Sequence, residues 1–300
     1  MTDKIIVSAP GKLLLMGEHA VVYGRPCLVV AVNKRLTLFL EKSETDEWLD
    51  SPFINEAVKV FREKTKIVTP VKIIPNTVFP RSLGLGSSSA VTVATIYGLS
   101  KLFLTPELEN KELFDLAFTT VKNVQGVGSG FDVAAAIYGG VIYYKNRGEI
   151  INPLTYEQLP IVVGYTGTKA DTVSMVQKVA EKKNENTMAV NLIFNNIADL
   201  VERAKIALFE QNWETLGSLM NLDQEYLAQL GVSTDRLEKM IQEAKQAGAY
   251  GAKLSGAGGG DCMIALVSKE KQAAVKEAIQ QVGGQIIELN IEPEGVRIEE

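Results

Sequence analysis

Two glycines and three serines stand together in GLGSSSA at residues 84–90, directly before an apolar segment. Unpaired backbone N–H groups at a helix N-terminus attract anions, and glycine lets a phosphate group approach the backbone. Serine hydroxyls can donate to phosphate oxygens or bind Mg²⁺. The spacing matches neither G-x-x-x-x-G-K-[ST] nor G-x-G-x-x-G. The segment is a candidate phosphate-binding loop, and a helix capped by serine is the simpler alternative.

Three more segments combine glycine with residues that could do chemistry. SGAGGGD (255–261) packs four glycines, which a tight loop between strands would also explain. GVGSGFD (126–132) ends on Asp132, whose simpler role is a helix N-cap. SAPGKLLLMGEHAVVYG (8–24) carries Lys12, Glu18 and His19, and a lone histidine is more often structural than catalytic. Together they supply the parts of a phosphoryl-transfer site, which needs positioning and charge neutralisation.

The elements that must position these residues follow from hydrophobic periodicity. Strands are predicted at 4–9, 27–41, 70–75, 140–145, 160–165, 252–255, 262–267 and 285–291. Helices are predicted at 52–64, 90–103, 111–123 and 269–282, with helix-like spacing at 133–136 and mostly helix over 171–242. The helix at 90–103 is apolar on nearly every side, so we expect it inside the protein. The order predicts an α+β fold of two domains, 1–160 and 161–300.

Composition excludes several classes of function. A formal charge of -5, with scattered Lys and Arg, argues against nucleic-acid binding. No run approaches the roughly twenty apolar residues of a membrane span, so a soluble, cytoplasmic protein is expected. Cys27 and Cys262 are predicted to be buried free thiols. His19 is the only histidine and no G-x-S-x-G accompanies it, which argues against a serine hydrolase.

PGKLLLMGEHAVVYG, PRSLGLGSSSA and KLSGAGGG, in this order, resemble the three signature motifs of the GHMP kinases, and the resemblance runs from about Ser8 to Met263. It implies an α+β fold with a ribosomal-S5-like N-terminal domain and a ferredoxin-like C-terminal domain. It also implies that ATP and Mg²⁺ bind in the cleft between the domains. Many members form homodimers, so the resemblance is compatible with a homodimer.

The resemblance also implies roles for single residues. Asp132 would act on the acceptor hydroxyl, with Lys12 beside it, and Ser88 would bind Mg²⁺. A nearby lysine would favour the ionised form of Asp132. The residues implied to contact the nucleotide are Asn33, Thr77, Gly84, Leu85, Gly86, Ser87, Ser88 and Ser89. Those implied to lie by the acceptor are Glu18, His19, Gly256, Ala257 and Gly258.

Within the family, GEHAVVYG resembles the mevalonate kinases, which makes mevalonate the expected small-molecule acceptor. GSGFDVAAAIYGG (128–140) and the pair Asp261-Cys262 look more like phosphomevalonate kinases, which stay an alternative. A phosphorylated acceptor would need further cations, for which Lys169 and Arg81 are candidates.

Two other points bear on the resemblance. Mevalonate kinases carry a glutamate about ten residues before the catalytic aspartate, where this chain has Val121-Lys122-Asn123, so a second Mg²⁺ ligand is not identified. Some proteins of this fold are non-enzymatic regulators, which typically lack the aspartate or the lysine. This chain keeps both.

Overall fold

The strand that carries Lys12 runs without interruption from Lys4 to Met16. The sequence predicts that it ends at residue 9, because a segment containing Gly11, Gly17 and Gly24 follows. Instead, register shifts between Pro10 and Gly11, and again between Leu14 and Met16, absorb the irregular residues while pairing with the next strand continues. The computed structural model describes residues 3–77, 83–104, 106–154, 159–292 and 294–299.

The first domain is built on a mixed sheet in the order β11-β1-β2-β4-β3, with β5 pairing with β2 and β6 pairing with β5. Its strands are β1 (Lys4–Met16), β2 (Cys27–Lys42), β3 (Glu47–Trp48), β4 (Val71–Thr77), β5 (Val141–Lys145), β6 (Ile150–Leu154) and β11 (Arg297–Glu299). β3, β6 and β11 are not predicted from the sequence, because two or three residues, or a short run containing Pro153, carry too little period-2 signal.

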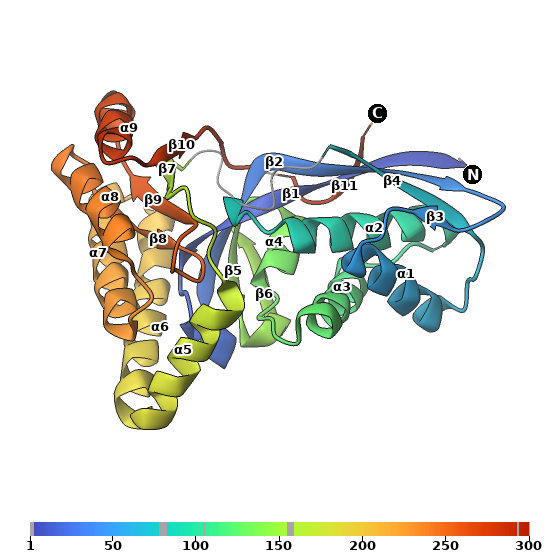
Figure 1. The fold of residues 1–300 in the computed structure, drawn as a ribbon, viewed down its shortest axis with the longest axis horizontal. Coiled ribbons are helices and arrows are strands. Elements are labelled where there is room, and N and C mark those ends of the chain that lie inside the picture. The colour runs from blue at the N-terminus through green and yellow to red at the C-terminus, as the bar shows by residue number, and fades with distance from the viewer. Residues whose placement is uncertain (1–2, 78–82, 105, 155–158, 293, 300) are drawn as a thin grey trace.

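Four helices cover one face of this sheet (Figure 1). They are α1 (Pro52–Thr65), α2 (Ser87–Phe103), α3 (Asn110–Gln125) and α4 (Phe131–Tyr138). α2 lies against β1 and β2 and is flanked by the other three helices. Most of its residues are buried, which confirms the expectation that this helix lies inside the protein. The N-terminus of α2 is thereby fixed beside the strand that bears Lys12.

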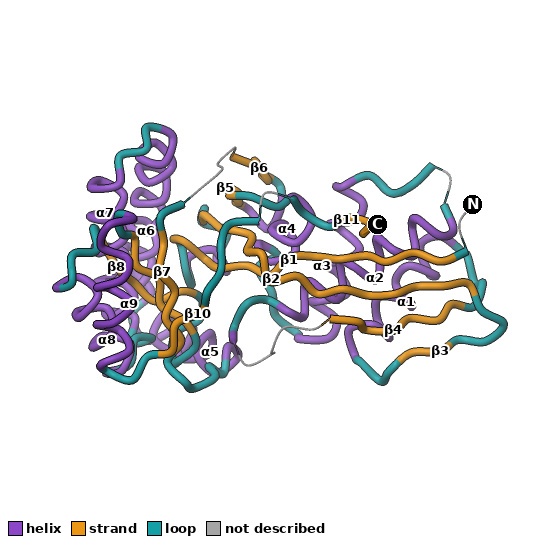
Figure 2. The backbone as a smooth tube through the Cα atoms, turned by 90° about the horizontal axis from the view of Figure 1, so that it is seen from above, coloured by secondary structure: helices purple, strands orange, loops and turns teal. Residues whose placement is uncertain are grey.

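The second domain pairs four strands in the order β10-β7-β9-β8 among the described residues. These are β7 (Ile161–Tyr165), β8 (Gly251–Ser255), β9 (Cys262–Leu266) and β10 (Gln285–Ile287). Its helices are α5 (Thr172–Glu185), α6 (Thr187–Phe209), α7 (Trp213–Leu230), α8 (Asp235–Gln246) and α9 (Gln272–Gln281). The second sheet and most of the helices of its domain lie at one end of the elongated molecule, and β1 and β2 run from there toward the other end (Figure 2).

The two domains are joined by more than the connection between β6 and β7. Ser255, at the end of β8, accepts a hydrogen bond from Leu14 N at 3.0 Å and donates one to Leu14 O at 2.9 Å. The chain also returns at its end, where β11 pairs with β1 in the first sheet. The α+β architecture predicted from the sequence is confirmed. The boundary near residue 160 falls between β6 and β7 and stays a prediction.

Candidate active site

Lys12 and the phosphate loop (residues 84–89) are held together by backbone and side-chain contacts. Lys12 N donates to Leu85 O at 2.8 Å, and Lys12 Nζ donates to Gly84 O at 3.1 Å. Gly86 has a φ of 78°, and a Cβ there would lie 2.9 Å from Lys12 Cγ. Glycine is therefore required twice over at residue 86, for its left-handed backbone and for the close approach of the lysine side chain.

The serines of the phosphate loop do not cap α2. The N-cap residue is Gly86, and no side chain makes a cap hydrogen bond there, so the simpler alternative of a serine-capped helix is wrong. Ser89 is fully buried and its hydroxyl donates to Asp132 Oδ2 at 2.6 Å. Ser87 and Ser88 line a cavity that a ligand can enter.

Asp132 is the second residue of α4, and the N-cap residue of that helix is Gly130. The alternative role of Asp132 as an N-cap is therefore also wrong. The turn before α4 is fixed because the hydroxyl of the buried Tyr144 donates to Ser129 O. A Cβ on Gly130 would collide with the same hydroxyl at 2.6 Å. The glycine turn thus fixes where α4 begins. Together with Ser89, it fixes the position of the Asp132 carboxylate.

A cavity of about 550 Å³ lies between the two domains. The predicted site residues on its wall are Lys12, His19, Gly84, Gly86, Ser87, Ser88, Asp132, Gly256 and Ala257. Phe131, Lys169, Ala170 and Asp261 line it as well. The lysine, the aspartate and the phosphate loop come from the first domain, and the glycine loop after β8 from the second. The fold therefore brings together residues that are far apart in the sequence, such as Lys12 and Ala257, which are 245 positions apart.

A smaller cavity of about 200 Å³ shares Ser87 and Ser88 with the large one. Its wall is mainly apolar and includes Leu36, Phe53 and Val91, with Asp50 as its one charged group among the described lining residues. The phosphate loop thus borders both cavities.

His19 has an unusual backbone, with φ 58° and ψ -46°. Its ring Nε2 lies 2.9 Å from Ala257 O. A carbonyl can only accept, so Nε2 carries the proton and Nδ1 is left as an acceptor. Burial lowers the pKa of His19 from its ordinary value of 6.5 to about 4. The imidazole is therefore neutral at neutral pH.

Glu18, which the family resemblance implies to lie beside the acceptor, does not line either cavity. Its carboxylate is fully buried and forms an ion pair with Lys253, which lies on β8. Asp223, on α7, lies 3.6 Å from Lys253 Nζ and is equally buried. The sequence gives little indication of this cluster, because its members are separated by up to 235 residues.

The glycine loop at 256–260 is shaped by close contacts with its surroundings. A Cβ on Gly258 would overlap Val232 O, and one on Gly260 would lie 2.6 Å from Thr168 O. Asp261 ends the loop, and its Oδ1 accepts a hydrogen bond from Ala170 N at 3.0 Å. Its side chain lies against Gly84, where a Cβ would be 2.6 Å from Asp261 Oδ2. Asp261 therefore adds a second carboxylate to the cavity, and burial raises its pKa.

Three other residues named by the sequence analysis lie apart from the cavity or cannot be placed. Asn33 Oδ1 accepts a hydrogen bond from Asn290 N at 2.9 Å, so its side chain holds the C-terminal segment. Thr77 is the last residue of β4, and its side chain lies outside what the structure describes, as does Arg81. Cys27 and Cys262 are buried and free, as predicted.

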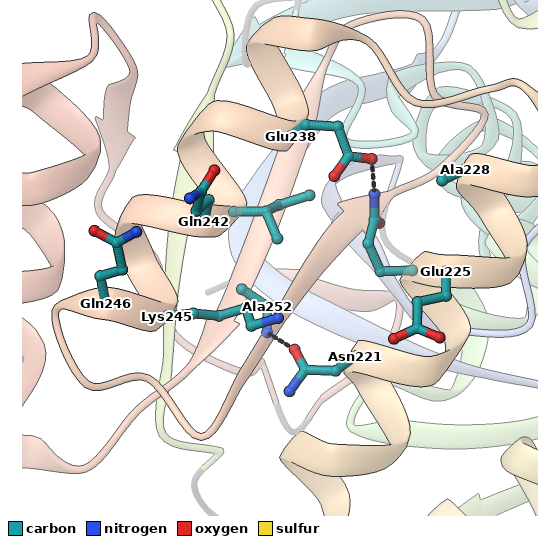
Figure 3. A pocket seen from close by; sticks show the side chains of 10 residues that line it. Asn221, Glu225, Ala228, Glu238, Gln242, Lys245, Gln246 and Ala252 are labelled. Atoms are coloured by element: carbon teal, nitrogen blue, oxygen red, sulfur yellow. Dashed lines mark hydrogen bonds between the residues drawn. The ribbon is translucent and has the colours of Figure 1, made fainter.

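A third cavity, of about 370 Å³, lies between α7 and α8 over β8 (Figure 3). Gln224 donates there to Glu238 at 2.8 Å, and Asn221 accepts from Ala252 N at 3.1 Å. None of the predicted site residues lines it. Within the described residues no helix is long and apolar enough to cross a membrane.

A lysine, an aspartate and a glycine-serine loop around one cavity are the arrangement that phosphoryl-transfer enzymes use. The sequence matches the GHMP kinases N terminal domain over residues 52–140 and the GHMP kinases C terminal description over residues 204–285. It is 36% identical to a mevalonate kinase of Thermococcus gammatolerans over 334 aligned positions, covering 99% of each chain. The chain belongs to the GHMP kinase family.

Solved structures agree with this assignment. The mevalonate kinase of L. major in complex with R-mevalonate superimposes with a TM-score of 0.81 at 27% identity, covering 98% of this chain and 97% of that one. The phosphomevalonate kinase of Streptococcus pneumoniae gives a TM-score of 0.84 at 20% identity, covering 96% and 99%. The second likeness concerns the fold alone.

Proposed function

We propose that the protein is a mevalonate kinase, which transfers the γ-phosphoryl group of ATP to the primary hydroxyl of mevalonate. The proposal rests above all on one observation: Asp132, Lys12 and the phosphate loop line the same cavity, with Ser89 fixing the aspartate. In the reaction, the acceptor oxygen forms a bond to the γ-phosphorus and the bond from that phosphorus to the bridging oxygen breaks. The hydroxyl proton passes to Asp132, and ADP leaves.

The two cavities that share Ser87 and Ser88 suit the two halves of a nucleotide. The small apolar cavity would hold the base, and the phosphates would pass over the N-terminus of α2 into the large cavity. Lys12 Nζ, which donates to Gly84 O at the start of the phosphate loop, would neutralise charge on the transferred group.

The oxygen ligands around the large cavity also fit Mg²⁺. Ser88 and Asp261 line it, and hydroxyl and carboxylate oxygens are the ligands that Mg²⁺ prefers. Within the described residues no group of three or more acidic, histidine or cysteine side chains forms a dedicated cage. Mg²⁺ is commonly bound by one or two carboxylates together with substrate phosphates, which matches this sparse set. When bound, the ion supplies positive charge to the phosphates.

His19 and the glycine loop would form the acceptor end of the cavity. Because His19 is neutral and Nε2 is used by Ala257 O, its Nδ1 can accept a hydrogen bond from an acceptor hydroxyl. The full-length relatives at 36% identity favour mevalonate over its phosphorylated product. Lys169 is a cation on the wall that a phosphorylated acceptor could use. A cytoplasmic location, a homodimer and the division of the chain at residue 160 stay predictions.

The decisive experiment offers mevalonate, 5-phosphomevalonate and galactose separately to the purified protein with MgATP and measures ADP release. We expect turnover on mevalonate. Turnover on phosphomevalonate alone would transfer the assignment to that acceptor and would give Lys169 the role of its phosphate ligand. If none of the three compounds led to ADP release, the proposed reaction would be contradicted.

Replacing Ser88 with Ala is expected to raise the Mg²⁺ concentration needed for half-maximal activity and to lower kcat about tenfold, roughly the effect of one lost ligand or hydrogen bond. Activity is measured over a Mg²⁺ titration at saturating ATP and mevalonate. Ser218→Ala, an exposed serine on α7, is the matched control. An unchanged Mg²⁺ requirement in Ser88→Ala would remove Ser88 from the metal site.

A further inference from the structure

Three ionisable side chains meet in the interior at a point where the two domains touch. Glu18 follows β1, Asp223 lies on α7 and Lys253 lies on β8, and each side chain is 0% exposed. Lys253 Nζ donates to a Glu18 carboxylate oxygen and to Leu254 O, the latter at 2.6 Å. We refer to Glu18, Asp223 and Lys253 as the buried charge cluster. Nothing in the proposed reaction uses it directly.

The cluster cannot hold all three charges at low cost. Two carboxylates and one ammonium group sum to -1, and a buried net charge is strongly unfavourable. Glu18 Oε2 and both oxygens of Asp223 have no hydrogen-bond partner within the part of the chain that the structure describes. One proton retained on either carboxyl makes the cluster neutral. Burial raises the pKa of both Glu18 and Asp223, in agreement with one retained proton.

The cluster is joined to the cavity through the residue next to Glu18. His19 follows it directly, and with φ 58° and ψ -46° it has a backbone conformation that a residue with a side chain rarely adopts. Such a conformation persists only where the surroundings enforce it. Glu18 is tied to Lys253 on β8, and the His19 ring is tied to Ala257 in the loop that follows β8. Two consecutive residues of the first domain are thus fixed to one strand and loop of the second.

Within the second domain, hydrogen bonds join the elements that carry Asp223 and Lys253. Gln224, which follows Asp223 on α7, accepts a hydrogen bond from Leu254 N at 2.9 Å and donates to Glu238 on α8 at 2.8 Å. Figure 3 shows these two helices facing each other across β8, with Asn221 bound to Ala252 one turn away. α7 and β8 are therefore locked in register on both sides of Asp223 and Lys253.

We propose that Lys253 and Asp223 are positioning residues: together with Glu18 they clamp the turn at residues 17–19 to the second domain and hold the His19 ring at the wall of the cavity. Glu18 acts through Lys253 and does not itself touch the acceptor. The consequence for acceptor binding rests on the proposed function, whereas the consequence for the geometry of His19 does not.

Because His19 is the only histidine of the sequence, its imidazole can be observed without ambiguity by NMR. Long-range ¹H–¹⁵N spectra of histidine-labelled protein distinguish the two neutral tautomers and the imidazolium ion. In the unmodified chain we expect a single Nε2-protonated tautomer that persists from pH 7.5 to 5. A ring that titrates near 6.5 in the unmodified chain would overturn the proposal, since it would not be held in the buried site.

The test variant is Lys253→Met, which keeps an unbranched side chain one atom shorter and removes its charge. A second variant, Glu18→Gln/Lys253→Met, avoids leaving Glu18 unpaired if the single change prevents folding. In each folded variant we expect mixed tautomers and a His19 titration that returns toward 6.5. Lys239→Met, an exposed lysine on α8, is the matched control and should keep the spectrum of the unmodified chain. An unchanged His19 spectrum in a folded variant would overturn the proposal.

Steady-state kinetics provide a second readout. His19→Ala is expected to raise KM for mevalonate about tenfold, the value of one hydrogen bond, with KM for ATP nearly unchanged. If Lys253 acts through His19, His19→Ala/Lys253→Met should raise KM for mevalonate no further than His19→Ala alone. If the fold-increases in KM caused by the two single substitutions multiplied in the double variant, the proposed clamp would be contradicted. If mevalonate is not the acceptor, this arm fails while the NMR result still decides the proposal.

Discussion

Asp132→Asn is expected to lower kcat with mevalonate by about 10²- to 10⁴-fold, the range over which a positioned general base contributes. The amide keeps the shape of the carboxylate and can still accept the hydrogen bond from Ser89. It has no affinity for the hydroxyl proton, so only the chemical step suffers. ATP binding should change little, because Asp132 belongs to α4 and not to the phosphate loop.

The kinetic constants are measured by coupled ADP release, and ATP affinity by calorimetry. Asp115→Asn, the same substitution at an exposed position of α3, should behave like the unmodified enzyme. If Asp132→Asn kept kcat within tenfold of normal, the aspartate would not be the group that receives the proton. If it also lost ATP affinity, its role would lie with the nucleotide.

Lys12→Met should lower kcat by about 10²- to 10³-fold, as expected when one preorganised charge is removed from a developing oxyanion. In contrast to Asp132→Asn, this change should also raise KM for ATP. Lys12 Nζ donates to Gly84 O, and its stem lies against Gly86, so the side chain supports the phosphate loop as well as the reacting group. The combination of both effects separates the lysine from the aspartate.

Lys4→Met on the same strand removes an exposed lysine that pairs with Glu41, and it serves as the control. Its side chain is 69% exposed, so the loss of this pair should have little effect on stability and none on catalysis. A Lys12→Met enzyme with normal kcat and a raised KM for ATP would restrict Lys12 to nucleotide binding.

Local sequence was sufficient wherever a segment carries its own signal. Ser51-Pro52 and the spacing of Ala57 and Phe61 predict α1, which runs from Pro52 to Thr65. The apolar run after GLGSSS predicts an interior helix, and α2 is one. The order of the glycine motifs predicts the family, which the comparisons confirm. These features depend on residues within a few turns of one another, or on motifs that can be matched one by one.

Contacts between distant segments could not be predicted in the same way. GLGSSSA is equally compatible with a serine cap, and only the fold turns Ser89 onto Asp132. The pair Asp261-Cys262 resembles phosphomevalonate kinases, and in the structure the Asp261 carboxylate lies against Gly84 on the cavity wall. The local sequence around a polar side chain is the same whether that side chain faces a ligand or contacts a residue far away in the sequence.

The sequence by itself determined the α+β class, the position of most elements, the GHMP kinase family and the residues from which a phosphoryl-transfer site could be built. Only the tertiary structure decided which of those residues line the cavity and which are buried in contacts with other residues. His19 faces the cavity, whereas its neighbour Glu18 is turned to Lys253 and Asp223. The physical reason is that burial of a charge is favourable only beside a partner, and here the partners come from α7 and β8, more than 200 residues further along the chain.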